Sequence, residues 1–231
     1  MALEEDLTTW VTDTFRFQWD EETTTLVPKP EDLRLNANHA KDLEEAVVLY
    51  ADLDGSTDMV DNYRWWFSAE IYKTFLKCSA DIIKQEGGVV TAYDGDRVMA
   101  VYTGDSKNSS AALTALKINH CVSQIIQPAI DHQYPNTEFK LNHVVGIDSS
   151  QLRAARIGVR GDNDIVWVGR AANYAAKLTS MPGKPTRITE AVYKRLRKDL
   201  KETDGTSMWN AEYWDEKSMV IYTSTWRWGG L

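Results

Sequence analysis

Acidic, glycine and hydroxyl residues follow directly on an apolar stretch in LYADLDGSTDM, residues 49–59. The carboxylates of Asp52 and Asp54 are oxygen ligands of the kind that Mg²⁺ and Mn²⁺ prefer. The backbone amides of Ser56 and Thr57, at the start of a predicted helix, could hold phosphate oxygens. The same residues could form an ordinary helix-capping turn, so this segment alone leaves a metal–phosphate site and a turn both open.

A second group of acids lies in VVTAYDGDRVMAVYTG, residues 89–104. Its apolar residues predict two strands, and Asp94-Gly95 predicts the tight hairpin turn between them. Asp96 then stands at the start of the second strand. Acids at a strand end or in a hairpin are individually common without any ion. They indicate a shared cation site only if the fold brings the two groups together.

The predicted elements around these acids have a β-α-β-β-α-β order. An apolar run rich in β-branched residues predicts a buried central strand, and apolar residues at three- and four-residue steps predict a long helix. In a ferredoxin-like fold the third strand lies beside the first and antiparallel to it, so Asp52 and Asp96 should meet at one edge of the sheet. The elements are a strand at 46–53, a helix over 58–85, the hairpin, a helix near 107–131 and a strand at 139–148.

The second half of the chain predicts further elements beyond this core. They are the apolar segments AARIGV and DIVWVG, a helix at 170–179, a helix over 189–200 with Thr189 as its N-cap, and a closing strand in SMVIYTSTWRW. The fold class is therefore α/β of the α+β type, a ferredoxin-like βαββαβ core with an antiparallel sheet, a C-terminal strand and additional helices. We expect an N-terminal extension over 1–44, a catalytic domain over 45–200 and a C-terminal segment over 201–231.

Composition narrows the classes of partner. The 231 residues carry a formal net charge of -8, which disfavours nucleic acid as a partner because that binding depends on clustered Lys and Arg. No stretch of 18 uncharged apolar residues occurs, which argues against a membrane span, and the acidic N-terminus is unlike a signal peptide. The two cysteines, Cys78 and Cys121, have no metal-binding spacing and indicate a reducing compartment. We expect a cytoplasmic protein.

The two acidic segments resemble the metal-binding motifs of class III nucleotidyl cyclases. LYADLDGST and GGVVTAYDGDRVMA are similar to the family patterns F-A-D-I-x-G-[FS]-T and G-G-x-x-x-K-x-x-G-D-x-x-x-A. The resemblance implies that Asp52 and Asp96 bind two divalent ions, Mn²⁺ or Mg²⁺, and that the backbone carbonyl of Leu53 adds a ligand. It also implies an intramolecular reaction, in which the ribose 3′-hydroxyl attacks the α-phosphorus and diphosphate leaves.

A third family motif, G-x-x-V-N-x-A-x-R, is similar to GRAANYAAKL, residues 169–178. The resemblance implies that Asn173 orients the ribose and that Lys177, where arginine is usual, stabilises the α-phosphate. Lysine keeps the positive charge but loses the planar fork of arginine. An Asn-x-x-x-Lys pair by itself is more often a solvated helix face. Family members form antiparallel dimers, so the resemblance implies a homodimer with active sites at the interface.

The positions that read the base in purine cyclases hold Ala92 and Val166 here, and neither side chain can hydrogen-bond a base edge. Tyr50 and Arg97 are candidates for a pocket rebuilt around another base, although Tyr50 could equally be a core aromatic. In these features the chain resembles the pyrimidine cyclases of Pycsar antiphage systems. That resemblance implies that UTP becomes 3′,5′-cyclic UMP, a second messenger that acts on a separate effector. A cytidylate cyclase, a purine cyclase and a degenerate nucleotide-binding sensor are the alternatives.

Overall fold

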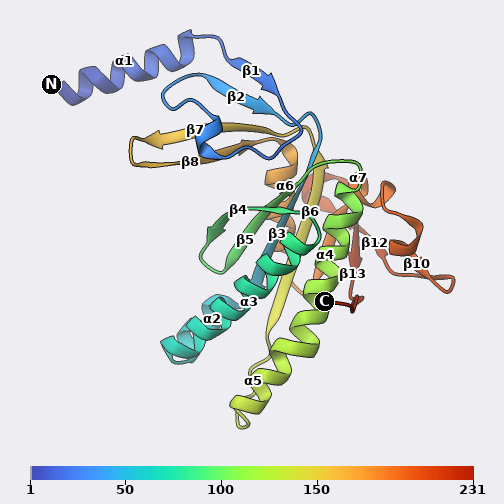
Figure 1. Cartoon of the computed structure of the whole chain (residues 1–231). Helices are drawn as coiled ribbons and strands as arrows, with labels where there is room; N and C mark the ends of the chain where they lie inside the picture. The colour runs from blue at the N-terminus through green and yellow to red at the C-terminus, as the bar shows by residue number, and fades with distance from the viewer. Residues whose placement is uncertain (1) are drawn as a thin grey trace.

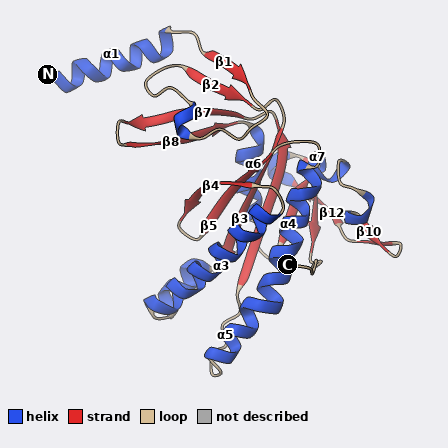
Figure 2. Ribbon diagram, viewed as in Figure 1, coloured by secondary structure: helices blue, strands red, loops and turns tan. Residues whose placement is uncertain are grey.

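A seven-stranded sheet forms the centre of the computed structural model, which describes residues 2–231 (Figures 1 and 2). The strands follow the order β12-β13-β9-β6-β3-β5-β4, with the long strands β3 and β6 near the middle. Their bounds are Ala46–Asp54 for β3, Val89–Asp94 for β4, Arg97–Tyr102 for β5, Asn142–Ser150 for β6, Thr186–Thr189 for β9, Asn210–Trp214 for β12 and Met219–Ser224 for β13.

Strand β3 pairs with β5 on one side and with β6 on the other, and both pairings are antiparallel. Its continuous apolar run allows burial of both faces, with Leu49 in one core cluster and Val48 in the other. The register sets Ala51 opposite Val98, so the end of β3 lies beside the start of β5. The predicted ferredoxin-like core and the predicted neighbourhood of its first and third strands are confirmed.

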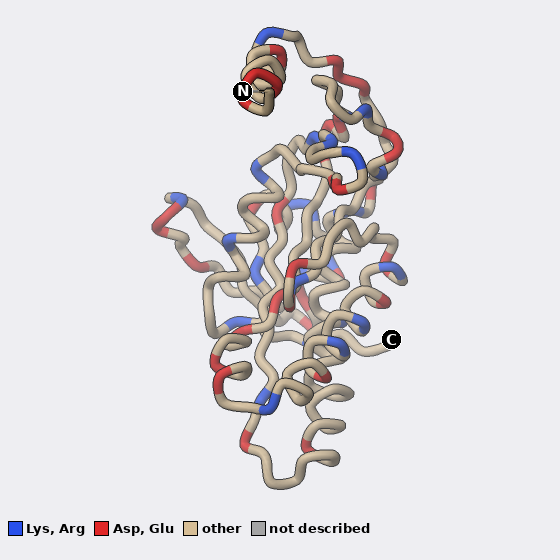
Figure 3. The backbone as a smooth tube through the Cα atoms, turned by 90° about the vertical axis from the view of Figure 1, so that its left-hand side faces the viewer, with Lys and Arg blue, Asp and Glu red and all other residues tan. Residues whose placement is uncertain are grey.

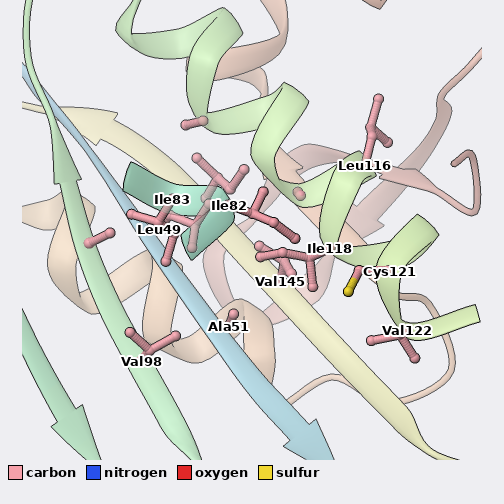
Figure 4. Packing of buried hydrophobic residues seen from close by; sticks show 14 of the residues in the cluster. Leu49, Ala51, Ile82, Ile83, Val98, Leu116, Ile118, Cys121, Val122 and Val145 are labelled. Atoms are coloured by element: carbon pink, nitrogen blue, oxygen red, sulfur yellow. The ribbon is translucent and has the colours of Figure 1, made fainter. Parts of the chain in front are cut away.

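Helices cover both faces of this sheet. On one face α3 (Trp65–Gln85) and α4 (Lys107–Cys121) pack through the apolar cluster shown in Figure 4. On the other face α6 (Arg170–Thr179) packs against β3 and β6. Because side chains alternate along a strand, Ala51 joins the α3–α4 layer whereas Asp52 points toward α6 and accepts a hydrogen bond from it.

The prediction of one continuous helix over 58–85 is wrong, because two helices cover this region. Helix α2 (Ser56–Asn62) ends before an extended Tyr63, and α3 begins after an extended Arg64. The break lets the Tyr63 ring stack on that of Phe67, with centroids 4.9 Å apart. The apolar spacing continues across the break, so periodicity alone does not reveal it.

The predicted helix near 107–131 is α4, followed by a π-helical turn (Val122–Ile126) and α5 (Gln127–Gln133). The predicted strand at 139–148 instead begins at Asn142, because the amide of Leu141 donates to the Gln127 side chain (2.8 Å) rather than to a neighbouring strand. Within residues 2–231, none of the helices combines the length and the apolar character needed to cross a membrane.

A second, four-stranded sheet stands beside the first, in the order β1-β2-β7-β8. The segments AARIGV and DIVWVG lie in β7 and β8, which form an antiparallel hairpin. Strands β1 and β2 come from residues 20–42, and β2 pairs with β7. Figure 1 shows α1 (Ala2–Arg16) projecting away from this sheet. Figure 3 shows acidic residues along α1. The strands span Asp20–Thr23 (β1), His39–Asp42 (β2), Arg153–Val159 (β7) and Asp162–Val168 (β8).

The predicted helix over 189–200 is wrong in its length. Helix α7 covers only Glu190–Lys194, and a 3₁₀ turn follows at Lys198–Leu200. Thr189 occupies the N-cap position, but its hydroxyl donates to the buried carboxylate of Asp148 (2.5 Å) and makes no cap hydrogen bond. The predicted closing strand is confirmed as β13, which pairs with β12 and β9.

Candidate active site

Asp52 lies near the end of β3 and is partly buried on the α6 side of the sheet. Burial, followed by the negative charge of Asp96, raises its pKa to about 6. Opposing these effects are the positive charge of Arg97 and a 3.3 Å hydrogen bond that the Thr179 hydroxyl donates to Asp52 Oδ2. The two predicted metal ligands are thus close enough to repel each other.

Asp96 lies in the turn that joins β4 to β5. Asp94 and Arg97 form the last pair of the hairpin, and Gly95 takes a positive φ of 61°. This geometry places Asp96 next to the end of β3, and its Oδ2 atom is buried without a hydrogen-bond partner among residues 2–231. An unpartnered carboxylate oxygen beside a second carboxylate fits a divalent cation, which would satisfy the oxygen and remove the repulsion.

Five residues predicted to contact the nucleotide line one cavity of about 340 Å³: Tyr50, Ala92, Arg97, Val166 and Asn173. They come from four strands and from α6, so only the folded chain brings them together. Within the cavity wall, the Arg97 guanidinium lies over the Tyr50 ring, 5.2 Å from its centroid. Asp94 accepts a 2.8 Å hydrogen bond from Arg97 Nη2, which supplies the anionic partner that a half-buried arginine needs.

The cavity also has an apolar wall that the sequence reasoning missed. Ile157, Ile165 and Trp167 line it from the β7–β8 hairpin. The apolar residues of these segments were visible in the sequence, but nothing in their spacing indicated that the hairpin belongs to a second sheet facing β5. The cavity therefore combines a polar side at Arg97 and Asn173 with an apolar side.

The other predicted residues lie outside this cavity. Lys177 is one turn beyond Asn173 on α6, and its Nζ atom contacts Glu216 Oε1 at 2.5 Å. Ser56 and Thr57 begin α2, directly after Gly55 in the left-handed conformation. The apolar side chain of Leu53 is buried in the α3–α4 layer.

Comparison with known proteins gives full-length relatives, although the sequence matches no family model. The chain is 65% identical over 228 residues to the uridylate cyclase of Burkholderia cepacia, covering 99% of each chain. It is 52% identical over 229 residues to the uridylate cyclase of Xanthomonas perforans, again covering 99% of each. The chain belongs to the uridylate cyclase family. The resemblance to pyrimidine-type class III cyclases predicted from the motifs is thereby confirmed.

Solved structures show that this uridylate cyclase family member has the class III cyclase fold. The adenylyl cyclase CyaB from P. aeruginosa superposes with a TM-score of 0.66 at 16% identity, covering 80% of this chain and 95% of that chain. The guanylyl cyclase Cya2 superposes with a TM-score of 0.65 at 14% identity, covering 80% and 93%. At these identities the likeness concerns the fold alone.

Within the described part of this uridylate cyclase family member, residues 2–231, a further cluster of metal-type ligands is formed by Asp20, Glu22 and His39 in the β1–β2 sheet. The backbone N–H of Arg34 donates to His39 Nδ1 (3.1 Å), so Nε2 carries the proton and donates to Glu22 (3.2 Å). The Arg34 guanidinium and Lys41 pair with the two carboxylates. Every group in the cluster is satisfied by protein, which distinguishes it from the Asp52–Asp96 pair.

Proposed function

We propose that this chain converts UTP into 3′,5′-cyclic UMP and diphosphate. The observation that carries the proposal is the pair of adjacent, unneutralised carboxyl groups at Asp52 and Asp96, in a chain whose full-length relatives are uridylate cyclases. The ribose 3′-hydroxyl attacks the α-phosphorus of the same nucleotide, and the bond from that phosphorus to the diphosphate breaks. Little covalent chemistry falls to the protein, so it acts by orienting the nucleotide and placing charge.

Asp52 and Asp96, with the Leu53 carbonyl, would hold two divalent ions, Mn²⁺ or Mg²⁺. When bound, such ions acidify the attacking hydroxyl and neutralise charge on the phosphates. The partial burial of Asp52 strengthens its attraction for cations, because water screens the charge less. Its raised pKa means that cation binding at mildly acidic pH must displace a proton.

The cavity residues favour uracil on grounds of hydrogen bonding. Arginine has only donors, and Arg97 is fixed over the Tyr50 ring by its bond to Asp94. Uracil presents two carbonyl acceptors, whereas cytosine replaces one of them with an amino donor. Ala92 and Val166 add no polar group that could read a purine edge. The proposed base contacts are therefore donors from Arg97 and the Tyr50 hydroxyl, beside an apolar wall.

Asn173 and Lys177 would act on the sugar and the phosphates. Asn173 reaches the cavity and can hydrogen-bond the ribose, while Lys177 supplies the positive charge for the α-phosphate after leaving Glu216. The amides of Ser56 and Thr57, at the start of α2, would support the remaining phosphate oxygens. These roles follow from the motif positions; of these residues Asn173 lines the cavity, and the others lie outside it.

We propose a homodimer with active sites at the interface, in which Asp52 and Asp96 of one chain face Asn173 and Lys177 of the other. Mixing two inactive variants tests this arrangement. If sites are shared, combining Asp52→Asn chains with Asn173→Ala chains restores roughly a quarter of wild-type activity, since half of the dimers are mixed and each holds one intact site. Activity that stays at the level of the separate variants would instead place each site within one chain.

In the cell the product would be a second messenger of antiviral defence, made in the cytoplasm and acting on a separate effector protein. This part of the proposal rests on the family. The net charge of -8 is consistent with a small nucleotide bound through metal ions rather than with a nucleic-acid partner.

An assay with the four ribonucleoside triphosphates tests the activity. The purified chain is incubated with each triphosphate and Mn²⁺, and products are identified by mass spectrometry. We expect cyclic UMP as the main product and none from Asp52→Asn. Cyclic CMP or a cyclic purine nucleotide as the main product would overturn the assignment of the base, and the absence of any product would favour a nucleotide-binding sensor.

A further inference from the structure

A second cavity, of about 510 Å³, opens at the end of the sheet where β6 begins. Its walls are the π-helical turn, the first residues of β6, the loop at 183–185 and Arg227, which follows β13. No residue lines both this cavity and the one at Tyr50 and Arg97. Gln127 of α5 also lines this cavity, and the catalytic proposal assigns the cavity nothing.

The charge of this cavity is positive, in contrast to the chain as a whole. Lys140, Lys184 and Arg227 line it together with one acid, Asp54. Lys140 pairs with Asp131 at 3.1 Å, but across residues 2–231 neither Lys184 nor Arg227 has an acidic partner within 4.0 Å. Two unpaired cations on one cavity, in a chain with a net charge of -8, attract a small anion.

Both unpaired cations sit on backbone that buried side chains hold in place. The guanidinium of Arg187, 3% exposed, donates to the carbonyls of Pro182 and Lys184 at 2.7 Å each. On the other side Asn119, 7% exposed, donates to the carbonyls of Thr225 (3.0 Å) and Trp226 (2.8 Å), directly before Arg227. The backbone segments that carry Lys184 and Arg227 are therefore already ordered, which lowers the conformational entropy that the protein loses on binding a ligand.

A buried imidazole supplies an independent indication of a ligand. His143 lines the cavity and is 6% exposed, and its Nε2 atom has no hydrogen-bond partner among residues 2–231. Leaving a buried polar nitrogen unpaired destabilises the protein, and a hydrogen bond to a ligand oxygen would remove that cost. The ring of Phe75 packs against that of His143, with ring centroids 6.0 Å apart. His143, which carries the unpaired nitrogen, and the two unpaired cations therefore line the same cavity.

We propose that this cavity is a binding site for a small phosphate-bearing anion. Lys184 and Arg227 contact the phosphate oxygens, and His143 forms a hydrogen bond to the ligand from the cavity wall. Apolar atoms of Val122, Leu141 and Pro185 line the remainder, so the cavity can also receive an organic group attached to the phosphate. The shared chemistry fits both orthophosphate and a nucleoside monophosphate.

Titrations without divalent metal test this proposal separately from catalysis. The full chain, in EDTA, is titrated with orthophosphate and with uridine 5′-monophosphate while backbone amide signals are followed by NMR. We expect saturable shifts at residues 183–185 and 141–143 with at least one probe. Saturation by orthophosphate indicates a phosphate site, and tighter binding of the monophosphate indicates that the apolar wall also contacts the ligand; both results support the proposal.

Two variants and one control variant test which residues bind the anion. The double variant Lys184→Ala, Arg227→Ala should weaken binding by roughly tenfold or more, because each charged hydrogen bond contributes about 1.5–3 kcal/mol. The control Lys73→Ala, Arg160→Ala removes the same charges from exposed positions elsewhere and should bind like the wild type. His143→Gln tests the buried contact and should also weaken binding. The proposal is overturned if the wild type shows no saturation up to about 10 mM of either probe, or if the control and the double variant weaken equally.

Discussion

Two sets of carboxylates lie at the same sheet, the buried Asp148 and the partly buried pair Asp52 and Asp96, and they differ in how their oxygens are satisfied. Asp148, on β6, is fully buried, yet Arg170 donates to both of its oxygens (2.9 and 3.2 Å) and Thr189 donates as well. Asp96 has a buried oxygen with no hydrogen-bond partner in residues 2–231, and Asp52 beside it has a raised pKa. Side chains of the protein satisfy the oxygens of Asp148. For Asp52 and Asp96, a bound cation would satisfy the unpartnered oxygen and remove the repulsion between the two carboxylates.

This difference gives a physical criterion for recognising a site. A carboxylate that supports the fold is neutralised by the protein itself, because an unpaired buried charge is costly. A carboxylate that binds cations must be left available, and the fold tolerates the repulsion that results. The Asp20, Glu22 and His39 cluster belongs with Asp148 by this criterion, since Arg34 and Lys41 neutralise it.

The largest expected effect is loss of activity at the unneutralised pair. Asp96→Asn should lower kcat by roughly a thousandfold or more, since metal-ion stabilisation of the transition state amounts to several kcal/mol. The same change should leave the free energy of unfolding unchanged or raise it, because it removes a repulsion. Initial rates with UTP and Mn²⁺, together with urea unfolding, measure both quantities. Asp61→Asn is the control, because Asp61 is exposed and forms no ion pair among residues 2–231. Near-normal turnover in Asp96→Asn would contradict the metal assignment.

Asp148→Asn should show the reverse pattern. The change leaves Arg170 without its buried partner and should cost about 3 kcal/mol of unfolding free energy, at the low end for a broken buried pair because the Arg170 side chain is 42% exposed. Where the variant is still folded, its kcat should stay within a few-fold of wild type. Urea unfolding and initial rates measure the two effects. A variant as stable as the wild type would contradict the conclusion that Asp148 serves to stabilise the fold.

A pH-dependent stability difference should accompany the raised pKa of Asp52. In metal-free protein the folded state holds this proton up to about pH 6, while the unfolded chain loses it near pH 3.8, the ordinary pKa of an aspartate. The contribution of Asp52 is therefore fully present below that value and is lost as the pH rises through about 6. The Tm of Asp52→Asn minus that of the wild type should accordingly increase between pH 4 and pH 7. A Tm difference that stays constant or shrinks would contradict the assigned environment.

The smallest expected effect concerns the exposed pair of Lys177 and Glu216. Each side chain is about half exposed, so water screens the two charges and the pair contributes little to stability. Glu216→Gln should free Lys177 for the nucleotide and lower KM for UTP by a factor of a few, with kcat little changed. Steady-state kinetics measures kcat and KM separately and so checks this prediction. A large fall in kcat would show instead that Glu216 takes part in the chemistry.

The sequence predicted the core and the acid pair because both depend on local patterns. The apolar run before Asp52 and the Asp94-Gly95 turn before Asp96 specify a strand end and a hairpin, and the β-α-β-β-α-β order then brings them together. The break at Tyr63 was not predicted, because apolar spacing continues across it. The sheet formed by residues 20–42 with β7 was also missed, since its short strands are polar and their pairing is long-range.

The most direct test of the account is to locate Mn²⁺ by anomalous diffraction in crystals of the chain grown with a non-hydrolysable UTP analogue. We expect manganese density in contact with carboxylate oxygens of both Asp52 and Asp96, next to the nucleotide phosphates. Manganese bound only elsewhere, for example at Asp20 and Glu22, or nucleotide bound with no metal between those two aspartates, would contradict the central claim.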